Sequence, residues 1–217
     1  MDPALEQAMA ELVQIGALEA GSAPADVTDL VVVHARGLAG IESFEALTTL
    51  SLIGCDLADW AGLAALDRLR VLGIEYSALT EIGWVDALEV QVLGLRGNRM
   101  VEVRELDGIA ALQSVDLRGN PLGSAAYAWA RDVLAARVRV QLDDKETWEL
   151  CRAIQDEGWP AVAYRDARGL RVAWTGLGDS DAPEAGHPVV SPDDVRSALR
   201  SPEGLRALLP GRDRANG

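Results

Sequence analysis

The side chains most capable of catalysis or metal binding are few in this sequence, and they stand far apart. The two histidines, His34 and His187, have no second histidine, cysteine or aspartate at the spacing of metal ligands. The two cysteines, Cys55 and Cys151, form neither a metal-binding motif nor a disulfide framework. We therefore expect no metal site, and we interpret both cysteines as packing residues.

Neighbouring carboxylates occur at two places in the sequence. Asp143 and Asp144 precede a predicted helix and are expected to cap it, whereas Asp179 and Asp181 fall in a loop rich in glycine and proline. Neither pair supplies enough oxygen ligands at tight spacing for calcium. No nucleophile with a local base is visible, although folding alone can bring such groups together. These residues predict a protein that is not an enzyme and that binds no cofactor.

The charged residues bear on the choice of partner. The chain has a net charge of −14, and residues 1–122 hold 19 acidic and 7 basic side chains. An acidic surface repels phosphate backbones, so direct binding of nucleic acid is not expected. The acidity serves either solubility or the attraction of a basic partner, and the sequence leaves both open.

The sequence has no segment that is typical of export or of membrane insertion. Residues 1–6 lack the basic and then apolar pattern of a signal peptide. No apolar run approaches the length of about 18 residues that a membrane helix needs. Two cysteines without a disulfide framework fit a reducing compartment. We therefore expect a cytoplasmic protein with no membrane contact and no evident small-molecule substrate.

The elements that must carry any binding surface are repeats. In each copy the first, fourth, sixth and eleventh positions are apolar, and the ninth is Asn, Cys or Ser. The copies begin at residues 47, 69, 90 and 112, so the steps between them are 22, 21 and 22 residues. A weaker first copy begins at Val27. The four full copies are Leu47-Leu50-Leu52-Cys55-Leu57, Leu69-Leu72-Ile74-Ser77-Leu79, Val90-Leu93-Leu95-Asn98-Met100 and Leu112-Val115-Leu117-Asn120-Leu122.

Each copy predicts one short strand and one return. In the Leu-x-Leu element the leucines point into the core and the intervening residues point out. The polar column lies where the chain turns, and a side-chain amide such as that of Asn98 can satisfy backbone groups freed by the turn. Between the copies apolar residues recur every third position, as from Leu57 to Leu69, which suits a 3₁₀ return. One copy cannot bury its own apolar face, so the copies must stack and both ends need caps.

On these columns the chain resembles leucine-rich-repeat proteins, in particular the class with 22-residue repeats found in protein-phosphatase regulators. The resemblance covers about residues 27–122. It implies an α/β solenoid with a parallel β-sheet on its concave face and short helical or 3₁₀ returns. It also implies binding of another protein through that face. The family shares this manner of binding but no common partner.

The segments around the repeats divide the chain into three parts. Residues 1–24 form an N-terminal helical cap, with a helix over residues 3–20. Residues 25–142 form the solenoid and its C-terminal cap, which consists of a helix from Ser124 to about Arg137 and a further strand. Residues 143–217 form a small α/β extension or subdomain that contains a helix, a β-hairpin and two short helices. We favour an extension in which the strand at Val162 continues the parallel sheet, and we expect residues 211–217 to be disordered.

The repeat template also indicates which side chains project from the concave face. We predict that apolar contact area comes from Val33 and Ile53, and that specificity comes from four further side chains. The alternative is that the chain merely tolerates these residues, or covers them with its own C-terminal part. The predicted partner-binding residues are Val33, Ile53, Glu75, Tyr76, Arg96 and Arg118.

The sequence therefore favours a non-enzymatic module that binds a partner protein through the concave face of the sheet. A narrower alternative is an acidic antidote of the immunity type, which would mask a basic toxin or enzyme. A rival from another class is that residues 143–217 form an effector or enzymatic domain that the repeats target.

Overall fold

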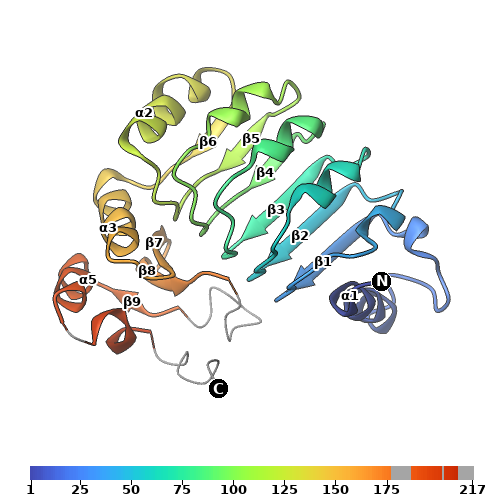
Figure 1. The fold of residues 1–217 in the computed structure, drawn as a ribbon, viewed down its shortest axis with the longest axis horizontal. Coiled ribbons are helices and arrows are strands. Elements are labelled where there is room, and N and C mark those ends of the chain that lie inside the picture. Colours follow the sequence, from blue (N-terminus) through green and yellow to red (C-terminus); the bar gives the residue numbers. More distant parts are fainter. Residues whose placement is uncertain (177–186, 202, 210–217) are drawn as a thin grey trace.

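The computed structural model describes residues 1–176, 187–201 and 203–209, and its main feature is a curved parallel sheet (Figure 1). The strands are β1 (Asp29–Val33), β2 (Thr49–Ile53), β3 (Val71–Glu75), β4 (Val92–Gly94), β5 (Ser114–Asp116) and β6 (Arg139–Gln141). They pair in chain order, β1 to β6, to form a six-stranded sheet. The predicted α/β solenoid with a parallel sheet is confirmed.

The Leu-x-Leu columns explain why each repeat forms a strand at this place. Leu50 and Leu52 of β2 are fully buried, and Leu72 and Ile74 of β3 lie beside them in register. One face of every strand thus enters a continuous apolar core, and the alternate residues stay outside. The returns on the other side are the predicted 3₁₀ helices: η2 (Ile41–Ser43), η3 (Ala61–Ala65), η4 (Gly83–Ala87) and η5 (Arg104–Gly108).

The polar column joins neighbouring repeats, as expected. The amide nitrogen of Asn98 donates to the carbonyl of Ile74 at 2.6 Å and to that of Leu95 at 2.9 Å. Where serine replaces asparagine, the hydroxyl of Ser77 accepts from the backbone N–H of Cys55 at 2.9 Å. These bonds satisfy backbone groups that would otherwise be buried without a partner.

The N-terminal helix α1 (Pro3–Gln14) is shorter than the sequence suggested. Asp2 caps it by accepting a hydrogen bond from the N–H of Ala4 at 2.9 Å, and Leu5 is fully buried against the first repeat. The predicted end at residue 20 is wrong. The chain leaves the helix at Gly16, whose φ of +74° is left-handed, and the preceding Ile15 is 75% exposed.

The predicted cap helix after the last repeat is divided into two pieces, α2 (Ser124–Asp132) and the 3₁₀ helix η6 (Leu134–Ala136). Gly123 is the N-cap residue of α2, and Ser124 is its first helical residue. The hydroxyl of Ser124 instead accepts a hydrogen bond from Arg152. The strand predicted after this helix is confirmed as β6, the last of the parallel sheet.

Beyond β6 the chain forms an α/β unit with a sheet of its own. Its elements are α3 (Lys145–Asp156), β7 (Ala161–Asp166), β8 (Gly169–Trp174), β9 (Val189–Val190), α5 (Pro192–Leu199) and η7 (Gly204–Ala207). Asp144 caps α3 as predicted, by accepting from the N–H of Thr147 at 2.8 Å. The three strands pair in the order β7-β8-β9, and both pairs are antiparallel.

This second sheet confirms the predicted hairpin and corrects the favoured extension. The strand at Val162 does not continue the parallel sheet, because β7 pairs with β8 across the tight turn after Asp166 and has no pairing with β6. The short strand β9 was not predicted. The expected disorder of residues 211–217 and the carboxylates Asp179 and Asp181 lie outside the described residues.

Two clusters of buried side chains correspond to the two sheets. One runs through the repeats from Leu5 to Val138, and the other joins α3, β7, β8 and α5. Tyr76 comes from the repeats but belongs to the second cluster, so the α/β unit is packed directly on the solenoid. The boundaries after residues 24 and 142 stay predictions. No helix among the described residues is long and apolar enough to cross a membrane.

Candidate partner-binding face

The outward side chains of the parallel sheet form rows that run across the strands. In one row Val71 of β3 pairs with Val92 of β4, and in the next Gly73 pairs with Gly94. Val71 is 37% exposed and Val92 is 41% exposed, while Val31 of β1 is 52% exposed. Because two neighbouring strands carry glycine at the same level, the centre of this concave face has little side-chain cover. The concave face therefore presents exposed valine side chains around a central part in which the glycines leave the backbone uncovered.

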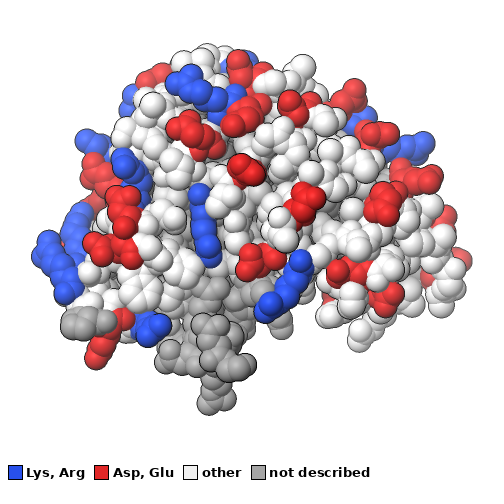
Figure 2. Space-filling model, viewed as in Figure 1, with Lys and Arg blue, Asp and Glu red and all other residues white. Residues whose placement is uncertain are grey.

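The charged side chains on the concave face are mostly fixed by neighbours. Hydrogen bonds from Thr28 and then Thr49 hold the pKa of Asp29 below its ordinary value, so this carboxylate is ionised at neutral pH. Arg118 forms an ion pair with Asp116, with 2.5 Å between Nη2 and Oδ2, and that bond raises the pKa of the guanidinium. Figure 2 shows acidic side chains scattered over the repeats with several basic ones between them, and a mixture of both signs over α3 and α5.

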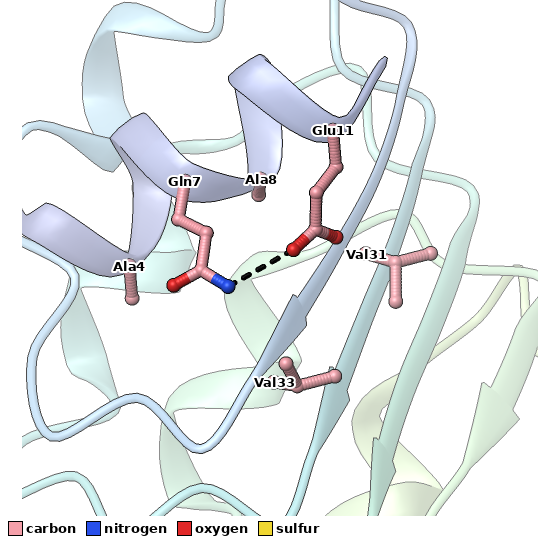
Figure 3. Close-up of a pocket in the computed structure, with 6 residues that line it drawn as sticks. All are labelled: Ala4, Gln7, Ala8, Glu11, Val31 and Val33. Atoms are coloured by element: carbon pink, nitrogen blue, oxygen red, sulfur yellow. Dashed lines mark hydrogen bonds between the residues drawn. The ribbon is translucent and has the colours of Figure 1, made fainter. Parts of the chain in front are cut away.

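The helix α1 lies along the open edge of the concave face and forms a shallow groove with β1 (Figure 3). The amide nitrogen of Gln7 donates to Oε1 of Glu11 at 3.0 Å, so the two polar residues stand together above the valines. The sequence predicts this helix only as a cap on the end of the core. The signal that was missed is the spacing of three or four residues between the helix side chains that line the groove, which places them on one face of the helix. The residues lining the groove are Ala4, Gln7, Ala8, Glu11, Val31 and Val33.

The α/β unit covers the other part of the predicted site. Tyr76 is 3% exposed and Arg96 is 8% exposed. The ring of Tyr76 lies 5.4 Å from that of Tyr164 in β7 and 5.0 Å from that of His187. The guanidinium carbon of Arg96 stands 4.5 Å from the centre of the Tyr164 ring and 5.6 Å from that of Tyr76. Burial raises the pKa of Tyr76 well above its ordinary value, so the phenol stays neutral.

Further bonds fix this junction between the repeats and the α/β unit. The N–H of Gly176 donates to the carbonyl of Tyr76 at 2.9 Å, and Nε of Arg99 donates to the hydroxyl of Thr175 at 2.6 Å. The buried carboxylate of Asp143 accepts from the N–H of Gly119 at 2.5 Å. Its burial raises the pKa of Asp143 to about 6.

The backbone at the end of each strand is left-handed in all five repeats. Two of these positions carry a ring in place of the usual glycine: His34 with φ of +54° and Tyr76 with φ of +49°. Each ring leans over the glycine of the next repeat. A Cβ at Gly54 would lie 2.7 Å from Cδ2 of His34, and one at Gly97 would lie 2.5 Å from Cδ1 of Tyr76. The ring and the glycine after it thus form a matched pair.

The six predicted residues are accordingly divided between two places. Val33, Ile53, Glu75 and Arg118 lie half-buried on the concave side, and their contact with a partner stays a prediction. Tyr76 and Arg96 lie in the junction instead. The template placed them at strand ends facing outward, but it carries no information on what the distant residues after β6 would cover.

The residues able to do chemistry are dispersed in the structure. Burial raises the pKa of the Cys55 thiol to about 11 and raises that of Cys151 as well. His187 shares a hydrogen bond of 2.8 Å with the hydroxyl of Tyr164. Within the described ranges no three His, Cys, Asp or Glu side chains are grouped so that they could hold a metal ion.

Comparison with known proteins bears on the fold. No protein-family model matches the chain, and no curated protein sequence matches it. A solved structure of an internalin C2 from Listeria monocytogenes has a TM-score of 0.50 and 19% identity, over 70% of this chain and 70% of that one. An internalin F of the same species has a TM-score of 0.41 and 16% identity, over 71% of this chain and 56% of that one.

At such identities the first likeness bears on architecture alone. Internalins are leucine-rich-repeat proteins, and the stacked Leu-x-Leu strands, the bonded polar column and the 3₁₀ returns are all present in this chain. The chain therefore has the leucine-rich-repeat fold.

Proposed function

We propose that the chain is a non-enzymatic module that binds a partner protein through the concave face of its sheet. Folds of this kind generally serve protein–protein interaction, because a curved row of strands presents one extended surface. The proposal includes the cytoplasmic location expected from the sequence.

The observation that carries this proposal is the row of exposed valines on the concave face. Val71 and Val92 stand side by side on paired strands, and Val31 lies on the same face. Burying a valine side chain contributes roughly 1.5–3 kcal/mol, and grouped exposed apolar residues mark interaction sites. Val33 and Ile53 add half-buried apolar area, with Glu75 and Arg118 as polar contacts around it.

Exposed positions of the concave face are the ones to substitute in a test of this proposal. Charge reversal at Arg96 would disturb the junction, so loss of binding there would not report on the face. A double variant Val71→Arg/Val92→Arg places two bulky charges on open positions of the face. Val101 and Val133 are 46% and 54% exposed and lie on other surfaces, so Val101→Arg/Val133→Arg is the matched control.

The experiment is affinity capture from an extract of the source organism with wild type and both variants. Wild type and the control variant are expected to retain a stoichiometric partner that the Val71/Val92 variant loses. Circular dichroism and the free energy of unfolding confirm that both variants fold. The same partner bound by all three proteins, or lost from both variants alike, contradicts the proposal.

A further inference from the structure

We propose that the α/β unit is a strap that joins four successive repeats and fixes the curvature of the concave face. The strap consists of Asp143, Tyr164, Thr175 and Gly176, which contact the chain where it leaves β2, β3, β4 and β5. Its consequence for partner binding rests on the proposed function. The coupling between repeats that it predicts is measured on the chain alone.

The repeats by themselves are joined only in series. The strands of the parallel sheet pair in chain order, and the returns η2, η3, η4 and η5 contact one another in the same order. In a solenoid of this kind each repeat touches only the repeats beside it, so bending and local opening need not involve distant repeats. A single rigid body that touches several repeats removes that freedom.

The strap is attached firmly at the ends of β5 and β4. The carboxylate of Asp143 accepts from the N–H of Gly119, which follows β5, at 2.5 Å. Tyr164 lies beside the same glycine, because a Cβ at Gly119 would be 3.4 Å from the Cβ of the tyrosine. The ring of Tyr164 also lies 4.5 Å from the guanidinium carbon of Arg96, which follows β4.

The strap then continues to the ends of β3 and β2 (Figure 1). Arg99, in the turn after β4, donates from Nε to the hydroxyl of Thr175 at 2.6 Å and from Nη2 to its carbonyl at 3.2 Å. The N–H of Gly176 donates to the carbonyl of Tyr76, which follows β3, at 2.9 Å. The carbonyl oxygen of Gly176 lies 3.5 Å from the place that a Cβ at Gly54, after β2, would occupy.

The strap is held rigid inside the α/β unit. The N–H of Thr175 donates to the carbonyl of Pro160 at 2.9 Å, and its hydroxyl donates to the same oxygen at 3.2 Å. The strands β7 and β8 are paired along their whole length, so Tyr164 and the end of β8 move together. Thr175 and Gly176 are both buried. A displacement at the β5 end of the strap is therefore passed to the β2 end.

This coupling bears on the concave face. Val71 and Val92 lie on β3 and β4, inside the span that the strap covers. Because the ends of these strands are held from outside the face, the exposed valines keep one arrangement before a partner arrives. A surface prepared in this way loses less conformational freedom on binding. The affinity of the face thus depends on residues that a partner does not touch.

Amide hydrogen exchange of the full chain, resolved by residue with NMR, tests the coupling. Arg99→Ala removes both bonds to Thr175 and is expected to speed exchange about tenfold, as for the net loss of one or two hydrogen bonds. The acceleration should reach β2, two repeats away from the substitution. Thr175→Val leaves every repeat residue unchanged, removes only the hydroxyl and should give the same pattern. It decides the question if Arg99→Ala does not fold.

Arg137→Ala is the matched control. It removes bonds of the same kind, from Nη2 to the carbonyls of Leu106 and Asp107, but these bonds connect neighbouring parts of the solenoid outside the strap. Exchange in this variant should accelerate in η5, β5 and β6 and stay unchanged in β2.

The curvature is measured directly by the distance between two spin labels. Ala65 in η3 and Ala125 in α2 are exposed and are replaced by cysteine for labelling. The native Cys55 and Cys151 are buried, so they do not compete for the label. Electron–electron resonance should give one narrow distance distribution in the otherwise unchanged chain and in Arg137→Ala, and a wider one in Arg99→Ala and Thr175→Val.

Three results would overturn the strap. Faster exchange confined to β4 and the α/β unit in Arg99→Ala and Thr175→Val would mean that the contacts act only locally. Equal acceleration of β2 in Arg137→Ala would mean that the sheet alone transmits the change. Distance distributions of equal width in all four proteins would mean that the curvature is fixed without the strap. The proposed function is separate from these results, because the capture experiment with the valine variants decides it.

Discussion

Replacing Gly97 by alanine should loosen the contact between the repeats and the α/β unit. Gly97 follows β4 with φ of +71°, where any Cβ is unfavourable. A Cβ there would lie 2.5 Å from Cδ1 and 2.8 Å from Cε1 of Tyr76. The ring cannot simply turn aside, because it packs against Tyr164 and His187.

The expected loss of stability has two parts. The left-handed backbone costs alanine about 1–2 kcal/mol, and forcing extra volume into a packed site costs about 1–3 kcal/mol more. We therefore expect Gly97→Ala to lower the free energy of unfolding by about 2–5 kcal/mol. Gly158 provides the control. Its φ is +75°, but a Cβ there would meet nothing within 4 Å, so Gly158→Ala should show only the backbone part.

Urea denaturation of both variants measures the two losses, and amide hydrogen exchange locates them. In Gly97→Ala, exchange should accelerate most in β7 and β8, because Tyr76 packs against the strand that carries Tyr164. A loss in Gly97→Ala no greater than that in Gly158→Ala would refute the reasoning, since it would mean that the Tyr76 ring has room to move. Faster exchange in α1 and β1 alone would refute it as well.

Three further predictions concern polar side chains that accept or donate hydrogen bonds to the backbone. Burial raises the pKa of Asp143 to about 6 in the folded protein, so folding binds a proton between pH 4 and 6. As the pH rises through that range, the free energy of unfolding of the wild type should fall by up to about 3 kcal/mol relative to that of Asp143→Asn. Urea unfolding at several pH values measures this difference. Parallel pH profiles for the two proteins would contradict this. Asn98→Ala leaves the buried carbonyl of Ile74 without its side-chain donor, whereas that of Leu95 keeps a bond from Asn120, and the variant should cost about 1–3 kcal/mol in calorimetry; a loss under about 0.5 kcal/mol would count against it. Asp144→Ala removes the cap that accepts from Thr147 and should cost about 1 kcal/mol, with faster amide exchange confined to the first turn of α3.

The repeats were predictable because each one is specified within about 22 residues. The leucine columns set the buried side of every strand, and the polar column sets the turn, so Asn98 has the bonds expected of it. The hairpin of β7 and β8 was also specified locally, by an alternating pattern on either side of a short turn. Local rules of this kind do not depend on what the rest of the chain does.

The candidate site was less predictable, because its limits depend on contacts between distant residues. No pattern near Tyr76 or Arg96 shows that Tyr164 packs over them. The end of α1 also needed the structure, since both Gly16 and Gly21 adopt left-handed backbones and the sequence could not show which one stops the helix. Glu11 became part of the groove only when the position of that helix beside β1 was known.

The pairing of a ring with the glycine of the following repeat limits how this solenoid could gain or lose repeats during evolution. Tyr76 fills the space that a side chain at position 97 would need, and His34 does the same at position 54. Copying a ring-bearing repeat by itself would set one ring against the Cβ of another. A gene duplication that carries the ring repeat together with the glycine repeat after it would keep each ring beside a glycine, so the pair is the unit in which this region could lengthen.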